Sequence, residues 1–341
     1  MFKVGVVGYG FMGHMHSQCY NATGDAKVVA IADIDPAKLA EAKEKLGAVG
    51  YSSIEDMLAS ADIDIVDICT PTYLHEQHVI AAANAGKFIM CEKPMSLTLE
   101  ACDRMIDVVN KTGVTLMMGM LIRFWSEYQV IKELVDSGKY GKVLWLSAQR
   151  RSSFPFHAWE NWFADPNKSG GAILDLHIHD QDYLLYLLGK PKEIFVLGTK
   201  GTGGGINGIQ AFGYGYESGA KSYAEGALDL APGFPFNMSL LVACEGATMK
   251  FDMSGEPSLM VYPFEGEPFA PELNKPKLAA STETSGNISD LGGYFNEIKY
   301  FVDCLKAGKK PERVTPQDAK EAVRICLAAA KSAETGKPVQ L

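Results

Sequence analysis

The sequence lacks several features that would assign it to a specialised class of protein. No CxxC pair occurs among its seven cysteines, whose number is odd, so we expect reduced, structural thiols rather than a disulfide framework or a zinc site. No apolar run approaches the roughly 20 residues that span a bilayer. The first residues, MFKVGVVGYG, begin a strand directly and lack the apolar core and cleavage site of a signal peptide. We therefore expect a cytoplasmic protein with no membrane partner.

Positive charge is also in short supply. The chain of 341 residues has 32 Lys and Arg against 41 Asp and Glu, a formal net charge of −9 at pH 7, which argues against a nucleic acid or an anionic membrane as partner. Hydrophobic residues make up 47% and charged residues 21%, the balance of an ordinary globular protein. A chain of this length has room for about two domains, each with its own core.

The first third of the sequence alternates short apolar runs with amphipathic helical patterns. Most of the helical patterns end on a glycine, as helix C-termini often do. Continuously apolar strands separated by helices indicate a parallel sheet that is covered on both faces. We therefore predict an α/β, doubly wound Rossmann domain over residues 1–121, with strands at 3–7, 27–32, 63–69, 87–91 and 114–119.

The pattern changes after a predicted helix near 124–138. Strand-like segments then follow one another without intervening helices, which indicates a large, open, mostly antiparallel sheet. These segments lie at 141–150, 191–200, 206–217, 221–230, 236–244 and 246–262. Residues 263–289 are rich in Pro, Glu, Ser and Thr and are expected to form a long loop, and two helices finish the chain. A C-terminal α+β domain over 122–341 follows, whose last helix, at about 315–335, is free to pack back on the first domain.

The segment VGVVGYGFMGHMH has the G-x-G-x-x-G pattern at Gly8, Gly10 and Gly13, between a strand and a helix. The first glycine permits a tight turn, the second lets a pyrophosphate approach the backbone, and the third allows close packing of helix on strand. Asp33 ends the second strand, 20 residues after Gly13, where a carboxylate binds a ribose 2′-hydroxyl and repels a 2′-phosphate. The combination predicts dinucleotide binding, with NAD favoured over NADP, against the alternative of a purely structural glycine turn.

Two further motifs follow strands and so lie at the edge where an open α/β sheet binds its ligand. CTPTYLH brings Thr70, Pro71 and His75 to this crevice. MCEKP brings Glu92 and Lys93 to it, and a lysine there would project toward the nicotinamide. His75 is equally well explained as a polar residue on the outer turn of a helix, and Lys93 as a surface lysine. The predicted cofactor-binding residues are Gly8, Gly10, Phe11, Met12, Gly13, Asp33, Thr70, Pro71, His75, Glu92 and Lys93.

The segment GGAILDLHIHDQDYLLYLLG combines an apolar, helix-prone pattern with carboxylates and imidazoles. A single helix over 171–188 would stack Asp175, His179 and Asp182 on one face at i, i+4 and i+7, beside an apolar stripe. With His177 nearby, these groups could bind a divalent metal, or they could form a buried hydrogen-bonded network. A metal is the weaker interpretation because no fourth ligand or cysteine pair accompanies them, so we predict no metal site.

Aromatic and basic side chains gather in the segment RRSSFPFHAWENWFADPNKSGG. Aromatic rings pack against the C–H faces of sugars, so Trp162 is a candidate for a carbohydrate pocket, although aromatic anchors of a long loop explain these residues equally well. Arg151, directly after Arg150, could pair with an acidic group on a substrate, such as a uronate or a phosphate.

Taken in order, GYGFMG, the strand-end Asp33, CTPTYLH, EKP and GGAILDLHIHDQD resemble the glucose-fructose oxidoreductase/inositol dehydrogenase/rhizopine-catabolism (Gfo/Idh/MocA) family. Each motif alone is modest, but the ordered set is specific, and the resemblance covers essentially the whole chain. It implies a Rossmann domain followed by an open antiparallel sheet, often the surface through which subunits pair. A homodimer or homotetramer formed through the C-terminal sheet is therefore expected.

The resemblance also assigns roles to residues. The EKP lysine of the family falls on Lys93, and its D-x-x-x-H pair falls on Asp175 and His179, which makes these three the expected catalytic residues. Asp182 matches an aspartate that contacts substrate hydroxyls in inositol dehydrogenases, and Arg123 matches a substrate-side arginine of some members. The expected substrate-binding residues are Lys93, Arg123, Arg151, Trp162, Asp175, His179 and Asp182. The chain departs from the inositol dehydrogenases near Arg151, where they have an asparagine, and this puts inositol itself in doubt.

The expected function is transfer of a hydride between NAD and a secondary hydroxyl of a cyclic polyol, sugar or sugar derivative. His179 would take the hydroxyl proton, Asp175 would orient the imidazolium, and Lys93 would polarise the oxygen, although Lys93 and His179 could exchange roles. Two other classes stay open: a glycosidase that uses tightly held NAD for a transient oxidation, and a non-catalytic dinucleotide-sensing regulator. The presence of the three catalytic candidates argues against the regulator, because a sensor has no use for a proton-transfer set.

Overall fold

The computed structural model describes residues 1–156, 159–276 and 291–341. The chain divides into two compact units, the first made of residues 1–124 and 276–320 and the second of residues 125–275 and 321–341. Most of the second half of the long loop expected at 263–289 lies outside the described residues.

The first unit takes in one helix from the far end of the chain. We expected all of residues 122–341 to form the second domain, with the last helix free to return to the first. The helix that lies wholly in the first unit is instead α10 (Gly292–Lys306). It packs against α1 (Phe11–Ala22) and buries Phe301 completely, so its apolar face completes the core of this unit. Helix α11 (Pro316–Thr335) begins in the first unit and continues in the second.

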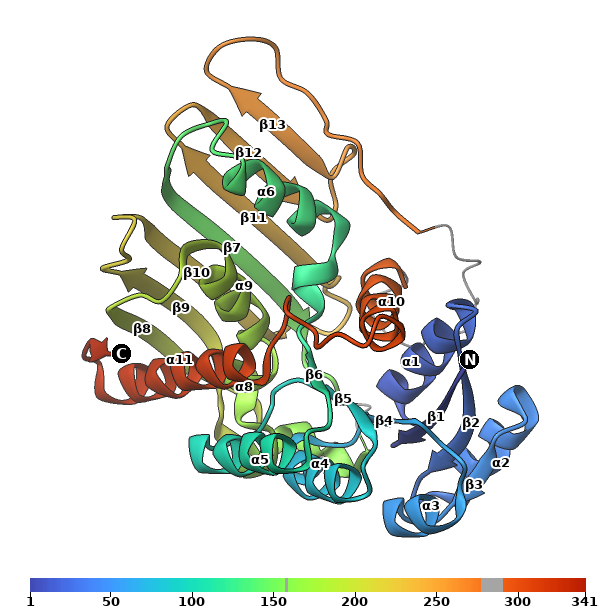
Figure 1. Cartoon of the computed structure of the whole chain (residues 1–341). Helices are drawn as coiled ribbons and strands as arrows, with labels where there is room; N and C mark the ends of the chain where they lie inside the picture. The colour runs from blue at the N-terminus through green and yellow to red at the C-terminus, as the bar shows by residue number, and fades with distance from the viewer. Residues whose placement is uncertain (157–158, 277–290) are drawn as a thin grey trace. The chain divides into compact units, whose positions relative to one another are not determined.

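The first unit contains a six-stranded parallel sheet in the order β3-β2-β1-β4-β5-β6 (Figure 1). Its strands are β1 (Phe2–Val7), β2 (Ala26–Ala32), β3 (Val49–Tyr51), β4 (Ile65–Ile68), β5 (Phe88–Glu92) and β6 (Leu116–Gly119). The five predicted strands are present, and the doubly wound α/β fold is confirmed. β3 was not predicted because it has only three residues and two of them are exposed.

The helices that connect these strands begin and end at residues suited to those positions. α2 (Pro36–Leu46) starts after Asp35, whose carboxylate accepts a hydrogen bond from Ala37 N at 2.9 Å, as an N-cap does. α2 and α5 (Leu99–Thr112) end at Gly47 and Gly113, whose φ angles are 67° and 75°. The other helical segments between these strands and after β6 are α3 (Ile54–Ser60), η1 (Thr72–Leu74), α4 (His75–Asn84) and η2 (Leu121–Phe124).

The second unit is built on an eight-stranded sheet in the order β13-β12-β11-β7-β10-β9-β8-β14 (Figure 1). Its strands are β7 (Val143–Ser153), β8 (Glu193–Lys200), β9 (Ile206–Tyr214), β10 (Lys221–Leu230), β11 (Asn237–Cys244), β12 (Ala247–Asp252), β13 (Leu259–Pro263) and β14 (Val339–Gln340). Neighbouring strands are antiparallel except β7 and β10, so the mostly antiparallel sheet is confirmed. The single strand predicted at 246–262 is instead the hairpin β12–β13, because the chain reverses between Asp252 and Leu259.

The two faces of this sheet differ. Along β7 and β10, buried residues alternate with more exposed ones, so one face is covered and the other is open. Helices α6 (Ser126–Asp136) and α9 (Ile178–Leu188) lie on the covered face (Figure 1). Tyr128 of α6 packs edge-on against Phe251 of β12 there, with ring centroids 5.2 Å apart. The helices therefore close the core of the second unit on this side of the sheet.

The single helix predicted over 171–188 is wrong, because the segment forms α8 (Gly171–Asp175) and α9 with Leu176 and His177 between them. Leu176 N makes the regular i to i−4 bond to Ala172 O at 3.0 Å, but His177 N donates to the same oxygen at 2.8 Å, five residues back, and so interrupts the pattern. The side chain of His177 is fully buried beside Gly226, where an added Cβ would lie 3.4 Å from the imidazole Nδ1. Packing of this imidazole on the sheet therefore outweighs the helical propensity of the sequence. The remaining helical turns of the unit are η3 (Trp159–Ala164), α7 (Pro166–Ser169) and η4 (Thr202–Gly204).

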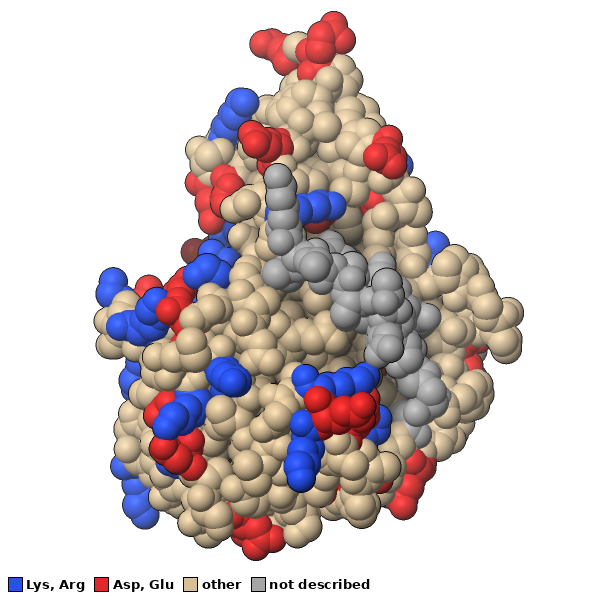
Figure 2. Space-filling model, turned by 90° about the vertical axis from the view of Figure 1, so that its right-hand side faces the viewer, with Lys and Arg blue, Asp and Glu red and all other residues tan. Residues whose placement is uncertain are grey.

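All seven cysteines are free thiols, and five of them are buried. Within the described ranges, no helix is long and apolar enough to cross a lipid bilayer. On the face shown in Figure 2, Lys and Arg are interspersed with Asp and Glu rather than gathered into a field of one sign. The fold is therefore held by apolar packing and hydrogen bonds rather than by disulfides.

Candidate active site

The glycine-rich loop joins β1 to α1 and requires glycine at two positions. Gly8 has a φ of 89°, and a Cβ added at Gly13 would lie 2.1 Å from Gly8 O. At Gly10, the N-cap of α1, an added Cβ would meet nothing within 4 Å. The first-turn N–H groups, at Phe11 and Met12, point out of the end of α1. An open approach to these donors fits a pyrophosphate.

The carboxylate of Asp33, at the end of β2, is held by two backbone N–H groups. Its Oδ2 accepts a hydrogen bond from Tyr9 N at 2.7 Å, and its Oδ1 accepts one from Asp35 N at 2.9 Å. Because Tyr9 belongs to the glycine-rich loop, the first bond ties the carboxylate to that loop. Asp33 is thus fixed where a ribose 2′-hydroxyl would be bound, so these residues fit an NAD molecule.

The loops that follow β1 and β4 meet at the point where the strand order of the first sheet reverses. A Cβ added at Gly8 would lie 2.9 Å from Cys69 O and 3.2 Å from Thr70 Cγ2, so the two loops are in contact. Ligands of open α/β sheets bind at such switch points. The structure therefore places Thr70 at the border of the glycine-rich loop, and contact of Thr70 and Pro71 with the cofactor stays a prediction.

The imidazole of His75 connects the two strand-end motifs. It is almost fully buried, with Nδ1 2.9 Å from Pro94 O and Nε2 2.9 Å from Thr70 O. Burial lowers the pKa of this ring. Both nitrogens thus face backbone carbonyls of the protein itself, so the geometry supports a structural link between the loops after β4 and β5.

Glu92, Lys93 and Pro94 form a turn at the end of β5, which we call the EKP turn. The Lys93–Pro94 peptide bond is cis. The Glu92 side chain is buried, and its Oε2 accepts a hydrogen bond from Lys93 N at 3.0 Å. Its other oxygen, Oε1, lies 3.0 Å from His16 Nε2. Glu92 therefore faces the interior of the unit rather than the cofactor crevice.

Sequence reasoning missed the buried residues His16 and Asp67 behind this turn. His16 Nδ1 lies 2.8 Å from Asp67 Oδ2 and 3.5 Å from Cys69 Sγ, and within the described part of the chain these three have metal-ligand spacing. The two shorter contacts of His16 are to carboxylates at hydrogen-bond distance, which fits an ion pair. The available signal was an aspartate in the middle of the apolar strand IDIVDIC, because a buried charge needs a partner.

Arg123 is a predicted substrate residue that the structure places in the core of the first unit. Its side chain is almost fully buried. Nη1 donates a hydrogen bond to Arg313 O at 2.7 Å and lies 3.4 Å from Asp318 Oδ2. The guanidinium thus fastens the segment that leads into α11, and its contact with a substrate stays a prediction.

In the second unit, the polar residues of the split helix are held at different depths. Asp175 ends α8 and His179 lies in the first turn of α9, and both are half-buried. Asp182 is buried one turn further along α9. Asp180, which sequence reasoning passed over, pairs with Arg150 through two contacts of 3.0 and 3.1 Å. The structure therefore brings the three predicted residues onto neighbouring turns of α8 and α9.

Arg151 and Trp162, two further predicted substrate-binding residues, lie on other elements than α8 and α9. Arg150 lies on the covered face of the sheet, so Arg151, the next residue of β7, lies on the open face. There Arg151 Nε pairs with Glu225 Oε1 at 2.6 Å. In contrast with the expectation, the sheet separates Arg151 from the helix that carries His179. Trp162 is half-buried in η3 and stacks on Phe163 with ring centroids 4.2 Å apart, and its contact with a sugar stays a prediction.

Comparison with known proteins places both units in one family. Residues 2–120 match the oxidoreductase family with an NAD-binding Rossmann fold named GFO/IDH/MocA, and residues 128–257 match the GFO/IDH/MocA C-terminal domain. The first match contains the glycine-rich loop and the EKP turn. The second contains α8 and α9, so each group of candidate residues lies inside a matched domain.

Individual relatives share the full length of the chain. A myo-inositol 2-dehydrogenase of Thermotoga maritima is 28% identical, with 99% of this chain and 98% of the relative covered. A scyllo-inositol 2-dehydrogenase (NAD+) of Bacillus subtilis is also 28% identical, with 99% and 96% covered. The crystal structure of a myo-inositol 2-dehydrogenase from Lactobacillus plantarum superimposes with a TM-score of 0.84 at 25% identity, over 100% of this chain and 99% of that one.

Proposed function

Because both of its domains match the same family, the chain belongs to the GFO/IDH/MocA oxidoreductases, and we propose that it is an NAD-dependent dehydrogenase of a cyclic polyol, sugar or sugar derivative. The observation that carries the proposal is the glycine-rich loop at the switch point, with Asp33 tied to it by the bond to Tyr9 N. That arrangement suits NAD. The substrate class is supported by the inositol dehydrogenases that share the length of the chain. A cytoplasmic location stays a prediction.

The proposed reaction removes a hydride and a proton from a secondary alcohol. The carbinol C–H bond breaks, and NAD, when bound, accepts the hydride at its nicotinamide C4. The hydroxyl O–H bond breaks as well, and we assign its proton to His179, with Asp175 as the group that orients the imidazole. Lys93 is assigned to the alcohol oxygen, where an ammonium stabilises the charge that develops. The roles of Lys93 and His179 could be exchanged without changing this balance.

The first experiment measures NADH formation by near-ultraviolet absorbance, with NAD and a panel of inositols, aldoses, uronates and sugar phosphates. We expect turnover of at least one panel member, and loss of that turnover in His179→Ala. Arg151→Met serves as the matched control, because Arg151 lies on the open face of the sheet and pairs with Glu225. Silence across the panel from a protein that binds NAD would contradict the proposed substrate class.

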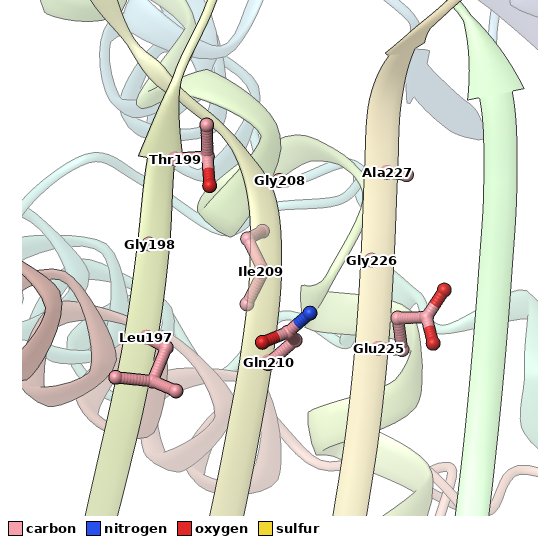
Figure 3. Close-up of a pocket in the computed structure, with 9 residues that line it drawn as sticks. All are labelled: Leu197, Gly198, Thr199, Gly208, Ile209, Gln210, Glu225, Gly226 and Ala227. Carbon is pink, nitrogen blue, oxygen red and sulfur yellow. The ribbon is translucent and has the colours of Figure 1, made fainter.

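The open face of the second sheet supports a homodimer or homotetramer. Trp145, Leu197 and Phe212 on this face have 47%, 50% and 38% of their surface exposed. A hollow of about 150 Å³ lies between β8, β9 and β10 (Figure 3). It is lined by Leu197, Gly198, Thr199, Gly208, Ile209, Gln210, Glu225, Gly226 and Ala227. Exposed apolar side chains gathered on one face are typical of a surface that another protein covers, and a second copy of the chain is the proposed partner.

A further inference from the structure

We propose that His16 is a positioning residue for the EKP turn: its ring joins Asp67 of β4 to Glu92 of β5 and so holds the backbone from which Lys93 extends. The inference deepens the proposed function and rests on the role assigned there to Lys93. His16 is not one of the residues proposed to bind NAD or the substrate. It is fully buried and so cannot touch a substrate.

The position of His16 follows from the motif that precedes it. It lies on α1, one turn after Gly13, on the side of the helix that faces the sheet. Gly13 has no side chain, and an added Cβ there would lie 2.1 Å from Gly8 O, so the close approach of α1 to the sheet depends on glycine. That approach brings the His16 ring, with none of its surface exposed, between the ends of β4 and β5.

The two ring nitrogens of His16 face carboxylates on neighbouring strands. Nδ1 lies 2.8 Å from Asp67 Oδ2, and Nε2 lies 3.0 Å from Glu92 Oε1. A carboxylate can only accept a hydrogen bond unless it is protonated, so Nδ1 donates to Asp67, and an imidazolium also forms an ion pair with Glu92 through Nε2. Burial opposes this charge, but the pKa of His16 lies well above its usual value because the Asp67 carboxylate is adjacent.

The contacts continue from His16 to the backbone of Lys93. Oε1 of Glu92 lies 3.0 Å from His16 Nε2 as an ion pair, and Oε2 accepts a hydrogen bond from Lys93 N at 3.0 Å. Rotation of the carboxylate away from the imidazole would therefore break the bond to Lys93 N. On the far side of the turn, His75 Nδ1 faces Pro94 O at 2.9 Å. The backbone on both sides of Lys93 is thus held by an imidazole.

The space around Glu92 is matched to this arrangement. Gly119 of β6 pairs with Glu92 in the sheet. A Cβ at Gly119 would lie 3.1 Å from Glu92 Oε1 and 3.2 Å from Glu92 Cδ, which is tighter than ordinary van der Waals contact. A glycine at this position therefore leaves room for the carboxylate in the one orientation that reaches both His16 and Lys93 N.

The surroundings of His16 contain few other charges. Besides Asp67 and Glu92, the titratable groups near it are Cys69 after β4, Cys91 on β5, Cys19 and Tyr20 on its own helix, and Tyr294 and Glu297 on α10. Burial raises the pKa of Cys19 and of Cys69 to about 12, so both thiols are neutral near pH 7. The carboxylates of Asp67 and Glu92 are therefore the groups that compensate the positive charge of His16.

The test compares His16→Gln with wild type, because glutamine is neutral and cannot form the ion pairs that an imidazolium forms with the two carboxylates. We expect kcat to fall about 10-fold or more, the effect of a small displacement of a catalytic group, while KM for NAD changes less than about 2-fold because the glycine-rich loop is intact. Cys19→Ala is the matched control: it also removes a buried group from α1, and we expect an unchanged kcat.

A second readout does not depend on turnover. Competitive acetylation with mass spectrometry compares the reactivity of Lys93 with that of the exposed Lys27 in the same protein. We expect the Lys93 rate to change by about 2-fold or more in His16→Gln, and in Gly119→Ala, which crowds Glu92 without touching His16. The labelling rate of Lys93 can be measured even if the protein turns over no substrate of the panel. A failure of the proposed function can therefore be told apart from a failure of this inference. Unchanged labelling in both variants, or a stoichiometric metal ion that is lost in His16→Gln, would overturn it.

Discussion

Arg150 donates two hydrogen bonds to Asp180, from Nε to Oδ2 at 3.1 Å and from Nη2 to Oδ1 at 3.0 Å. The side chains are 3% and 1% exposed, so the pair is a buried, bidentate link between β7 and α9. His179 directly precedes Asp180. The Arg150–Asp180 pair fixes this turn of α9 against the sheet, and it therefore also fixes the backbone from which His179, the proposed base, extends.

Arg150→Met should lower the free energy of unfolding by about 3–5 kcal/mol, because it leaves the Asp180 carboxylate buried without its partner. The double variant Arg150→Met/Asp180→Leu should recover most of that loss, since it removes both charges. Urea unfolding at pH 7 measures each value. Arg151→Met is the control: its partner Glu225 is partly exposed, so we expect a change of less than about 1 kcal/mol. Equal losses in the two single variants would contradict the account of the buried pair.

Asp33→Ser should shift the ratio of kcat/KM for NAD over NADP toward NADP by about 10–100-fold. The variant loses a charged hydrogen-bond acceptor for the ribose 2′-hydroxyl, worth roughly 1.5–3 kcal/mol, and it removes the repulsion of a 2′-phosphate. Asp35→Ser is the matched control, because serine also caps a helix and Asp35 caps α2. Steady-state kinetics with both cofactors measure the ratio, and an unaltered ratio in Asp33→Ser would rule out its ribose contact.

Lys93→Met should lower kcat by about 10²–10⁴-fold, the usual contribution of one acid–base or charge-stabilising group. Binding of NADH, followed by its fluorescence, should change less than about 2-fold because the glycine-rich loop is untouched. Lys27→Met removes an exposed lysine from β2 and should leave both quantities as in wild type. A Lys93→Met protein with wild-type kcat would exclude the lysine from the chemistry.

The sequence predicted the first sheet well because its signals are local. Apolar strands, glycine helix ends and the G-x-G-x-x-G pattern each depend on residues close together in the chain, and all lead to the same fold. β3 was not predicted because a strand of three residues, two of them exposed, carries no such signal. The fold of the second sheet was also predicted, although the reversal between Asp252 and Leu259 was missed.

The site was harder to predict because it depends on which way side chains point. The sequence RR gives no reason to choose between Arg150 and Arg151, and a shift of one residue along a strand exchanges the two faces of the sheet. The helix over 171–188 has an unbroken helical pattern, yet burial of His177 against Gly226 interrupts it. The partners of His16 lie 51 and 76 positions away in the chain. Such contacts are set by tertiary packing and have no local signature.

The free energy of unfolding should fall at acid pH because the His177 imidazole is buried in its neutral form. Burial lowers the pKa of this ring from its usual 6.5 to about 4, so the folded protein holds the neutral form. Between pH 6.5 and pH 4 the unfolded chain binds the extra proton, and this contribution to stability, complete above pH 6.5, is lost as the pH falls through that window. From pH 7.5 to pH 5 we expect a loss of about 2 kcal/mol from this group.

Urea unfolding of wild type and His177→Gln at those two pH values measures the contribution of His177. Glutamine keeps a polar group near Gln181, which lies 2.7 Å from His177 Nε2, but it does not titrate. The variant should therefore lose about 2 kcal/mol less than wild type over the same interval. Burial also lowers the pKa of His78 to about 4, so some acid sensitivity should persist in both proteins. Parallel losses in the two proteins would show that His177 does not titrate as described.

Negative charges introduced on the open face of the second sheet should dissociate the proposed oligomer into monomers. In an interface formed by a two-fold axis each residue is repeated on the other subunit, so Leu197→Glu/Phe212→Glu introduces four carboxylates into the proposed contact. We expect light scattering to report the chain mass of 37.0 kDa for this variant and a multiple of it for wild type. Val49→Glu, on β3 of the first unit and 57% exposed, should leave the multiple unchanged. Wild type at the chain mass, or a double variant that keeps the multiple, would exclude this face as the interface, because neither hydrophobic side chain would then be covered by a second copy.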